Sequence, residues 1–216
     1  MKTLKEQTDA KIEMGRKANP NFMKGVDEII LEARALKKDA NAIAVSTKVP
    51  NFELPNQEGK LISLTDLLET GPIVLTFYRG SWCPYCNLQL KALQSKLSDI
   101  HNLGAQLVAV SPQVPDKSLS KNEIEEMDFL VLSDQDAKVA LEYGVAWEIP
   151  EFLSLHMKND RGLDLEIVNN GNGSILPIPA TFVISKEGIV TWRYVDVDYR
   201  TRCEPDDIID SLRRLS

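Results

Sequence analysis

Two cysteines, Cys83 and Cys86, stand three positions apart and are the residues of this sequence best suited to chemistry. A continuous apolar run over 73–77 precedes them and leucines follow at helical spacing over 88–97, so the pair lies where a buried strand ends and a helix begins. The N–H groups and macrodipole at a helix N-terminus stabilise a thiolate, whose pKa falls from about 8.5 to between about 3.5 and 7.5. The spacing predicts a reversible disulfide with a potential of about −200 to −270 mV.

Two other interpretations of the pair are a structural zinc site and two inert buried thiols. Structural zinc usually takes two such cysteine pairs, or one pair with two histidines at short spacing. The remaining candidates, His101, His156 and Cys203, all stand isolated in the sequence. We therefore expect redox chemistry, with no metal and no other cofactor. Cys203, about 120 positions beyond the pair, is interpreted as a bystander.

The order in which the two thiols act follows from their places on the predicted helix. Cys83 is expected at the helix cap, where the dipole field is strongest and solvent reaches the sulfur. Cys86 is expected one turn inside, packed against the sheet, where desolvation keeps its thiol protonated longer. Pro84 stiffens the ring that a disulfide between Cys83 and Cys86 would close. Its missing N–H group is one that the first turn of a helix leaves unpaired in any case. The sequence thus predicts that Cys83 attacks first.

The composition restricts the class of protein that carries this pair. Of the 216 residues, 43% are hydrophobic and 26% are charged, as in an ordinary soluble domain. The 25 basic residues against 32 acidic ones give a net charge of −7, which argues against a nucleic-acid partner. No apolar run approaches the roughly 20 residues of a membrane span, and the charged N-terminus lacks the apolar segment of a secretory signal. We expect a cytoplasmic protein with no membrane partner.

Residues 1–45 differ from the rest and are predicted to form an N-terminal helical extension. Asn19 and Pro20 mark a helix start, as N-cap and first helical residue. An apolar stripe then recurs at helical spacing over 22–36. It either packs on the chain's own domain or forms the arm of a homodimer. We favour the first interpretation because intramolecular packing costs no association entropy.

From residue 46 onward, short strands alternate with helices. The predicted strands are a hairpin at 52–54 and 61–64, single strands at 73–77, 106–110 and 129–132, and a late hairpin at 180–184 and 189–194. Two predicted helices span 116–126 and 137–143. Three others begin at residue 63, directly after the cysteines and at Pro205. The Gly-broken segment 166–174 is predicted to be an inserted loop. This order predicts an α/β sheet with an antiparallel edge pair.

Three segments resemble the peroxiredoxins of the alkyl hydroperoxide reductase/thiol-specific antioxidant family: the opening 48–64, the cysteine segment 77–86 and the late hairpin 180–189. The resemblance spans roughly residues 46–215 and implies a thioredoxin-like fold, a central mixed sheet flanked by helices, for a domain of residues 46–216. It also implies a thiol-dependent peroxidase that reduces hydrogen peroxide or organic hydroperoxides. A thioredoxin- or glutathione-type reductant would regenerate the dithiol.

The cysteine segment departs from the family pattern at three positions. On the alignment, Cys86 takes the place of the peroxidatic cysteine, Cys83 replaces a threonine or serine, and Arg79 replaces a proline. The family's active-site arginine falls on Pro179. The residues that polarise the peroxide in the family therefore have no direct counterpart here.

The same segment also resembles thioredoxins and glutaredoxins. Residues Trp82 to Cys86 read Trp-Cys-Pro-Tyr-Cys, and Pro179 stands at the position of the cis-proline of those proteins. That resemblance makes Cys83 the exposed nucleophile and Cys86 the buried resolving thiol, with Trp82 and Pro179 beside them. We therefore predict a cis bond between Ile178 and Pro179.

Three hypotheses about function remain open. The first is a thiol-dependent peroxidase that works through Cys83 and Cys86. The second is a thioredoxin-like disulfide oxidoreductase without significant peroxidase activity, and the third is a non-catalytic module that assembles through its N-terminal helices. In the first, Arg79, Arg200 or Arg202 supplies the missing charge. The competing interpretation, slightly favoured, places these arginines on a solvated surface with ordinary salt bridges.

Overall fold

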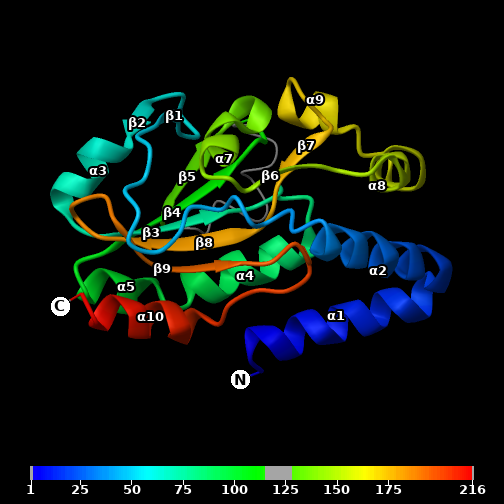
Figure 1. Ribbon diagram of the computed structural model, residues 1–216, viewed down its shortest axis with the longest axis horizontal. Coiled ribbons are helices and arrows are strands. Elements are labelled where there is room, and N and C mark those ends of the chain that lie inside the picture. The colour runs from blue at the N-terminus through cyan, green and yellow to red at the C-terminus, as the bar shows by residue number, and fades with distance from the viewer. Residues whose placement is uncertain (1, 115–127, 216) are drawn as a thin grey trace.

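A five-stranded mixed sheet forms the centre of the computed structural model, which describes residues 2–114 and 128–215 (Figure 1). In spatial order the strands are β5 (Leu130–Ser133), β4 (Gln106–Ser111), β3 (Ile73–Phe77), β8 (Ala180–Ile184) and β9 (Val190–Val195). The β3, β4 and β5 strands run parallel, whereas β8 pairs antiparallel with both β3 and β9. The predicted α/β sheet with an antiparallel edge pair is confirmed. The helix predicted at 116–126 lies outside the described residues.

Helices cover both faces of this sheet (Figure 1). One face packs against α4 (Pro84–Gln94), α5 (Leu97–Asn102) and α10 (Pro205–Arg213), and the other against α3 (Leu64–Thr70) and α7 (Lys138–Glu142). Because side chains alternate along a strand, Val74 of β3 joins the first core while Ile73 and Leu75 join the second. Every residue of β3 is buried, as expected for a strand covered on both faces.

Two smaller antiparallel pairs lie outside the central sheet. The first is the predicted hairpin, β1 (Glu53–Pro55) with β2 (Leu61–Ser63). The second joins β6 (Ala146–Glu148) to β7 (Ile175–Pro177). Short helical segments complete this part of the chain: Gln135–Ala137, α8 (Glu151–Leu155), a π-helical turn at His156–Asp160, and α9 (Leu165–Asn169).

The α9 helix corrects the sequence prediction, which treated 166–174 as loop throughout. Its start is fixed by Asp164, whose side chain accepts a hydrogen bond from the Glu166 N–H group at 3.1 Å. Leu165 is buried at the same point and attaches the first turn to the protein. Capping and two buried side chains, those of Leu165 and Asn169, therefore stabilise a helix that hydrophobic periodicity does not reveal.

The N-terminal segment forms two helices, α1 (Leu4–Ala18) and α2 (Pro20–Ala35), as predicted. The Asn19 side chain caps α2 by accepting from the Phe22 N–H group at 3.1 Å. Val26 and Ile30 of α2 are buried in the same apolar cluster as Cys83. Most of the apolar stripe of α2 thus packs on its own chain, as the favoured interpretation predicted, whereas Leu36 at its end is exposed.

No helix in the part of the chain that the structure describes is both long enough and apolar enough to cross a membrane.

Candidate functional site: a buried dithiol with three arginines

The dithiol lies at the junction between β3 and α4, as predicted. Cys83 is the N-cap of α4 and Pro84 its first residue. The turn before it contains Gly80 at φ 142°, where a Cβ atom would collide with the Trp82 indole nitrogen. Only glycine therefore fits this turn, and the turn places Cys83 at the N-cap of α4.

Both thiols are free and buried, with exposed fractions of 1% for Cys83 and 0% for Cys86. The prediction that solvent reaches the Cys83 sulfur is therefore wrong. Apolar residues of α2 and α8, including Val26 and Leu153, belong to the cluster that buries it. The sequence analysis did not place these helices near the thiols, because the residues around Cys83 do not show which distant segments pack over them.

The two thiols differ in acidity. Burial opposes ionisation of Cys83, yet its hydrogen bond with Cys86 and the charges of Arg79 and Arg202 outweigh burial and lower its pKa to about 5. Burial and the neighbouring Cys83 instead raise the pKa of Cys86 well above its ordinary value. At neutral pH, Cys83 is the thiolate and Cys86 the thiol that donates to it, in the predicted order.

Arg202 contacts the inner thiol directly. Its Nη2 atom lies 3.2 Å from the Cys86 Sγ atom, and its Nη1 atom donates to the Tyr199 carbonyl at 2.6 Å. Arg202 is only 7% exposed, and Arg79 and Arg200 are 5% exposed. The interpretation of these arginines as a solvated surface is therefore wrong.

A buried amide holds Arg202 in place. The Gln89 Oε1 atom accepts from Arg202 Nε at 2.6 Å. The Gln89 Nε2 group donates to the hydroxyls of Thr76 on β3 and Thr181 on β8, at 3.2 and 3.1 Å. Both the oxygen and the nitrogen of the Gln89 amide have protein partners. Gln89 therefore connects the Arg202 guanidinium to β3 and β8, and these bonds hold the guanidinium beside the dithiol.

Arg79 lies between two aromatic rings. Its guanidinium carbon is 5.0 Å from the centre of the Trp82 ring and 4.1 Å from that of Tyr199. No carboxylate among the described residues forms an ion pair with it. Its charge is therefore available to the Cys83 thiolate.

Arg200 has a different environment and links the covering helix to the site. It bonds Asp198 through Nε at 2.8 Å and Asp27 of α2 through Nη1 at 2.7 Å. Asp27 thus attaches α2 to the loop that also carries Tyr199 and Arg202. The charge of Arg200 is neutralised by these carboxylates rather than directed at the thiols.

Pro179 does not have the predicted geometry. The peptide bond between Ile178 and Pro179 is trans, as are the other peptide bonds of the described residues, so the cis prediction is wrong. The Ile178 N–H group donates to the Val145 carbonyl at 2.6 Å, and β8 begins at Ala180. A trans bond leads the chain directly from β7 into β8, and trans is also the favoured isomer of an X–Pro bond. Pro179 is buried but does not line the pocket at Cys83.

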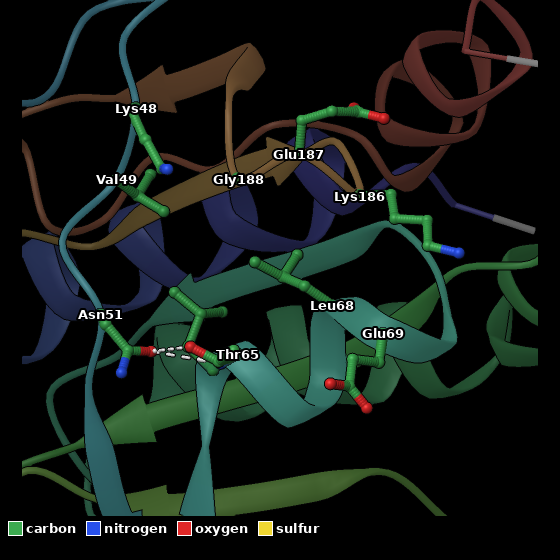
Figure 2. Close-up of a pocket in the computed structure, with 10 residues that line it drawn as sticks. Lys48, Val49, Asn51, Thr65, Leu68, Glu69, Lys186, Glu187 and Gly188 are labelled. Carbon is green, nitrogen blue, oxygen red and sulfur yellow. Dashed lines mark hydrogen bonds between the residues drawn. The ribbon is translucent and has the colours of Figure 1, made fainter.

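Two cavities are relevant to placing a substrate. One of about 150 Å³ opens onto Cys83 and is also lined by Arg79, Trp82 and Pro84. A second, of about 310 Å³, lies between the segment before β1, α3 and the β8–β9 turn (Figure 2). There the Asn51 side-chain oxygen accepts from the Thr65 N–H group at 3.1 Å (Figure 2). The larger cavity contains no cysteine, so the smaller one is the candidate active site.

Gln89 and Tyr199 are site residues that the sequence interpretation missed. Gln89 had a detectable signal, because it is a lone amide on the helix face that also carries Cys86 and Leu93. Tyr199 had none, because its place over Arg79 depends on a contact between segments 120 positions apart.

A thioredoxin-like sheet with a dithiol at the helix after its central strand defines the class of thiol oxidoreductases. The family model described as "AhpC/TSA family" matches residues 45–193. The putative peroxiredoxin bcp of Haemophilus influenzae is 33% identical over 113 residues, which cover 52% of this chain and 72% of that protein. Peroxiredoxin Bcp of Escherichia coli is 28% identical over 113 residues, covering 52% and 71%.

A solved structure shows the same fold. Peroxidoxin BcpB from Mycobacterium tuberculosis superposes with a TM-score of 0.62 at 24% identity, covering 81% of this chain and 99% of that one. The chain belongs to the AhpC/TSA family. The resemblance read from the sequence is confirmed, and the protein is a peroxiredoxin-type, thiol-dependent peroxidase.

Proposed function

We propose that Cys83 is the nucleophile of the peroxidase reaction and that Cys86 resolves its oxidised form. Cys83 supports this assignment because it lines the pocket and has the lowered pKa. Cys86 corresponds to the peroxidatic position of the family, but it is fully buried, does not line the pocket and has a raised pKa. The observation that carries the proposal is this difference in acidity and access between two thiols one turn apart.

The reaction then has two covalent steps. The Cys83 thiolate attacks the terminal oxygen of the hydroperoxide and the O–O bond breaks. The alkoxide or hydroxide that leaves takes up a proton from water and becomes an alcohol or water. The product is a sulfenic acid on Cys83. The Cys86 sulfur displaces its hydroxyl, which leaves as water, and an S–S bond forms. Two thiols of a thioredoxin-type reductant then restore the dithiol and become a disulfide themselves.

The arginines replace the family's missing polarising groups. Arg79 lies beside Cys83 without a carboxylate partner, so it stabilises both the thiolate and the alkoxide that develops when the O–O bond breaks. Arg202 contacts Cys86 and stabilises its thiolate in the second step. Trp82 and Pro84 shape the pocket around the attacking sulfur. Pro179 supports the site only by joining β7 to β8.

The test is a comparison of Cys83→Ser and Cys86→Ser proteins after one equivalent of hydrogen peroxide. We expect a sulfenic acid, trapped by dimedone and located by mass spectrometry, on Cys83 of the Cys86→Ser protein. The Cys83→Ser protein should give none. If Cys86 alone forms the adduct, the two roles are reversed.

The disulfide-oxidoreductase alternative is not favoured, and it is tested by measuring insulin-disulfide reduction beside peroxide consumption. A domain boundary near residue 45, a homodimer through the N-terminal helices and a cytoplasmic location stay predictions. Support for the boundary is that the family match begins at residue 45. Leu31 and Leu36, both more than half exposed on or beside α2, are the residues that such a dimer would cover.

A further inference from the structure

The pocket above Cys83 is larger than hydrogen peroxide requires. Its volume is about 150 Å³, whereas a water molecule takes a share of about 30 Å³ and hydrogen peroxide has only two oxygens. Its outer wall comes from α2 and from the segment 151–161 between β6 and β7. The α2 helix lies before residue 45, where the family match begins, and the segment 151–161 lies inside it.

The wall is a packed aromatic layer. The Phe22 ring stacks on His156 at 3.7 Å between ring centres and on Phe152 at 5.5 Å. A Cβ atom on Gly25 would lie 2.6 Å from the Phe152 ring, so glycine is what lets α2 and α8 approach this closely. Phe22 and Met157 therefore present a fixed apolar surface to the pocket.

The charged groups of the pocket are cationic. Arg79 and Arg161 line it, and no aspartate or glutamate of residues 2–114 and 128–215 does. Arg79 is 5% exposed and Arg161 is exposed, and neither pairs with a carboxylate of the described residues. Asp160, the acid beside Arg161 in sequence, instead bonds the His156 ring at 2.6 Å. One cation thus acts on the reacting sulfur, and a second, exposed cation has no carboxylate partner in the part of the chain that the structure describes.

We propose that this pocket selects an organic hydroperoxide that combines an apolar body with an acidic group. Phe22 and Met157 contact the body, Arg79 receives the peroxide oxygens and Arg161 binds the acid. The inference rests on the proposed function, because it places the O–O bond at Cys83. Phe22 and Arg161 are its specificity-determining residues. Burying an apolar body against Phe22 favours binding, and an unpaired guanidinium beside it favours an anion over a neutral analogue.

Cumene hydroperoxide and its 4-carboxy derivative form a matched neutral and acidic pair for the test. We expect the full-length protein to have a kcat/KM about two- to fivefold higher for the acid, the range of a partly exposed ion pair, and to lose this preference in high salt. Arg161→Gln should bring the ratio of the two kcat/KM values close to one, and Arg161→Lys should keep part of it. The control is Arg214→Gln, an exposed arginine at the end of α10, which should keep the wild-type ratio.

The apolar wall is tested with Phe22→Ala and the milder Phe22→Leu. Both should lower kcat/KM for cumene hydroperoxide relative to hydrogen peroxide, with the larger change in Phe22→Ala. Equal turnover of the acid and the neutral compound, or a ratio that Arg161→Gln does not change, overturns the inference. A dimedone adduct on Cys83 of the Cys86→Ser protein still upholds the proposed function in that case. A folded wild-type protein that consumes no hydroperoxide overturns both.

Discussion

Two regions of this protein place a buried cysteine near the N-terminus of a helix that begins with proline, and the two thiols behave in opposite ways. Cys83 caps α4 and has a pKa lowered to about 5. Cys203 lies just before α10, and burial, with Asp207 contributing, raises its pKa to about 12. Their exposed fractions, 1% and 5%, are almost equal.

The charges around the two helix starts account for the difference. The first turn of α4 contains no acidic residue, and the cations Arg79 and Arg202 act on its cysteine. The first turn of α10 carries Asp206 and Asp207, which are favourable for the helix dipole but unfavourable for a thiolate. A helix N-terminus therefore does not create a nucleophile by itself. The thiolate forms at Cys83 because Arg79 and Arg202, which pair with no carboxylate among the described residues, lower its pKa.

The largest effect should come from removing the Cys83 thiol, and removing the Cys203 thiol is its matched control. Cys83→Ser should reduce peroxide turnover by at least about 1,000-fold, because the attacking sulfur is lost. Cys203→Ser should leave turnover near the wild-type value, because that thiol is protonated and lies in a different apolar cluster. The measurement is hydrogen-peroxide consumption coupled to a thioredoxin system. A Cys203→Ser protein as inactive as Cys83→Ser would contradict the comparison.

Removing the Arg202 guanidinium should give the next largest effect. Arg202→Met deprives Cys86 of its cation and leaves the Gln89 oxygen without its donor. We expect the disulfide-forming step to slow by about 100-fold, so that the Cys83 sulfenic acid accumulates in rapid-quench mass spectrometry. The free energy of unfolding should fall by about 1–3 kcal/mol.

Arg202→Lys serves as the matched control, since it keeps a charge but loses the planar arrangement of donors. It should recover part of the rate. A sulfenic acid that disappears at the wild-type rate in Arg202→Met would remove Arg202 from the second step.

The pH dependence of alkylation should separate the two thiols directly. Only a thiolate reacts with iodoacetamide, so the Cys83 rate should rise with pH through about 5 and stay level from there to neutral pH. Below the pKa the sulfur is protonated and the rate falls. Cys203, with a pKa of about 12, should remain unmodified over the same range in the folded protein. A Cys83 rate that still climbs steeply between pH 7 and 9 would show that the cations do not control it.

The smallest effect should come from Asp207→Asn. Removing this carboxylate lowers the pKa of Cys203, but burial is the larger cause of the raised value and is unchanged. The thiol should therefore stay unreactive at neutral pH, as shown by a thiol count with the folded protein. Rapid modification of Cys203 in this variant would show that the carboxylate, rather than burial, keeps this thiol protonated.

The strands and the place of the dithiol follow from the sequence because they depend on local patterns. The apolar run of β3, the pairing of β8 with β9 and the proline at the start of α4 are each contained in a short segment. The helix cap at Cys83 follows from the same local order, whereas its lowered pKa also depends on Arg202, which is distant in the sequence.

The environment of the dithiol does not follow from local patterns. Arg202 reaches Cys86 across 116 positions, and an isolated arginine in a polar loop is ordinarily exposed. The covering of Cys83 by α2 likewise depends on tertiary packing. The resemblance of Pro179 to the cis-proline of thioredoxins did not predict the isomer correctly. The bond is trans, in keeping with the direct path of the chain from β7 to β8.

The hydrogen bonds at the start of α1 have a consequence for biosynthesis. The Glu204 carboxylate accepts from the N–H groups of Leu4 and Lys5 at 3.0 and 2.7 Å, and Arg200 bonds Asp27 of α2. Translation begins at the N-terminus, so Arg200 and Glu204 emerge from the ribosome more than 100 positions after Cys83. Until then Cys83 lacks both the contacts that hold α1 and α2 in place and Arg202, one of the cations that lower its pKa, so the thiol is covered and activated at the same stage of synthesis.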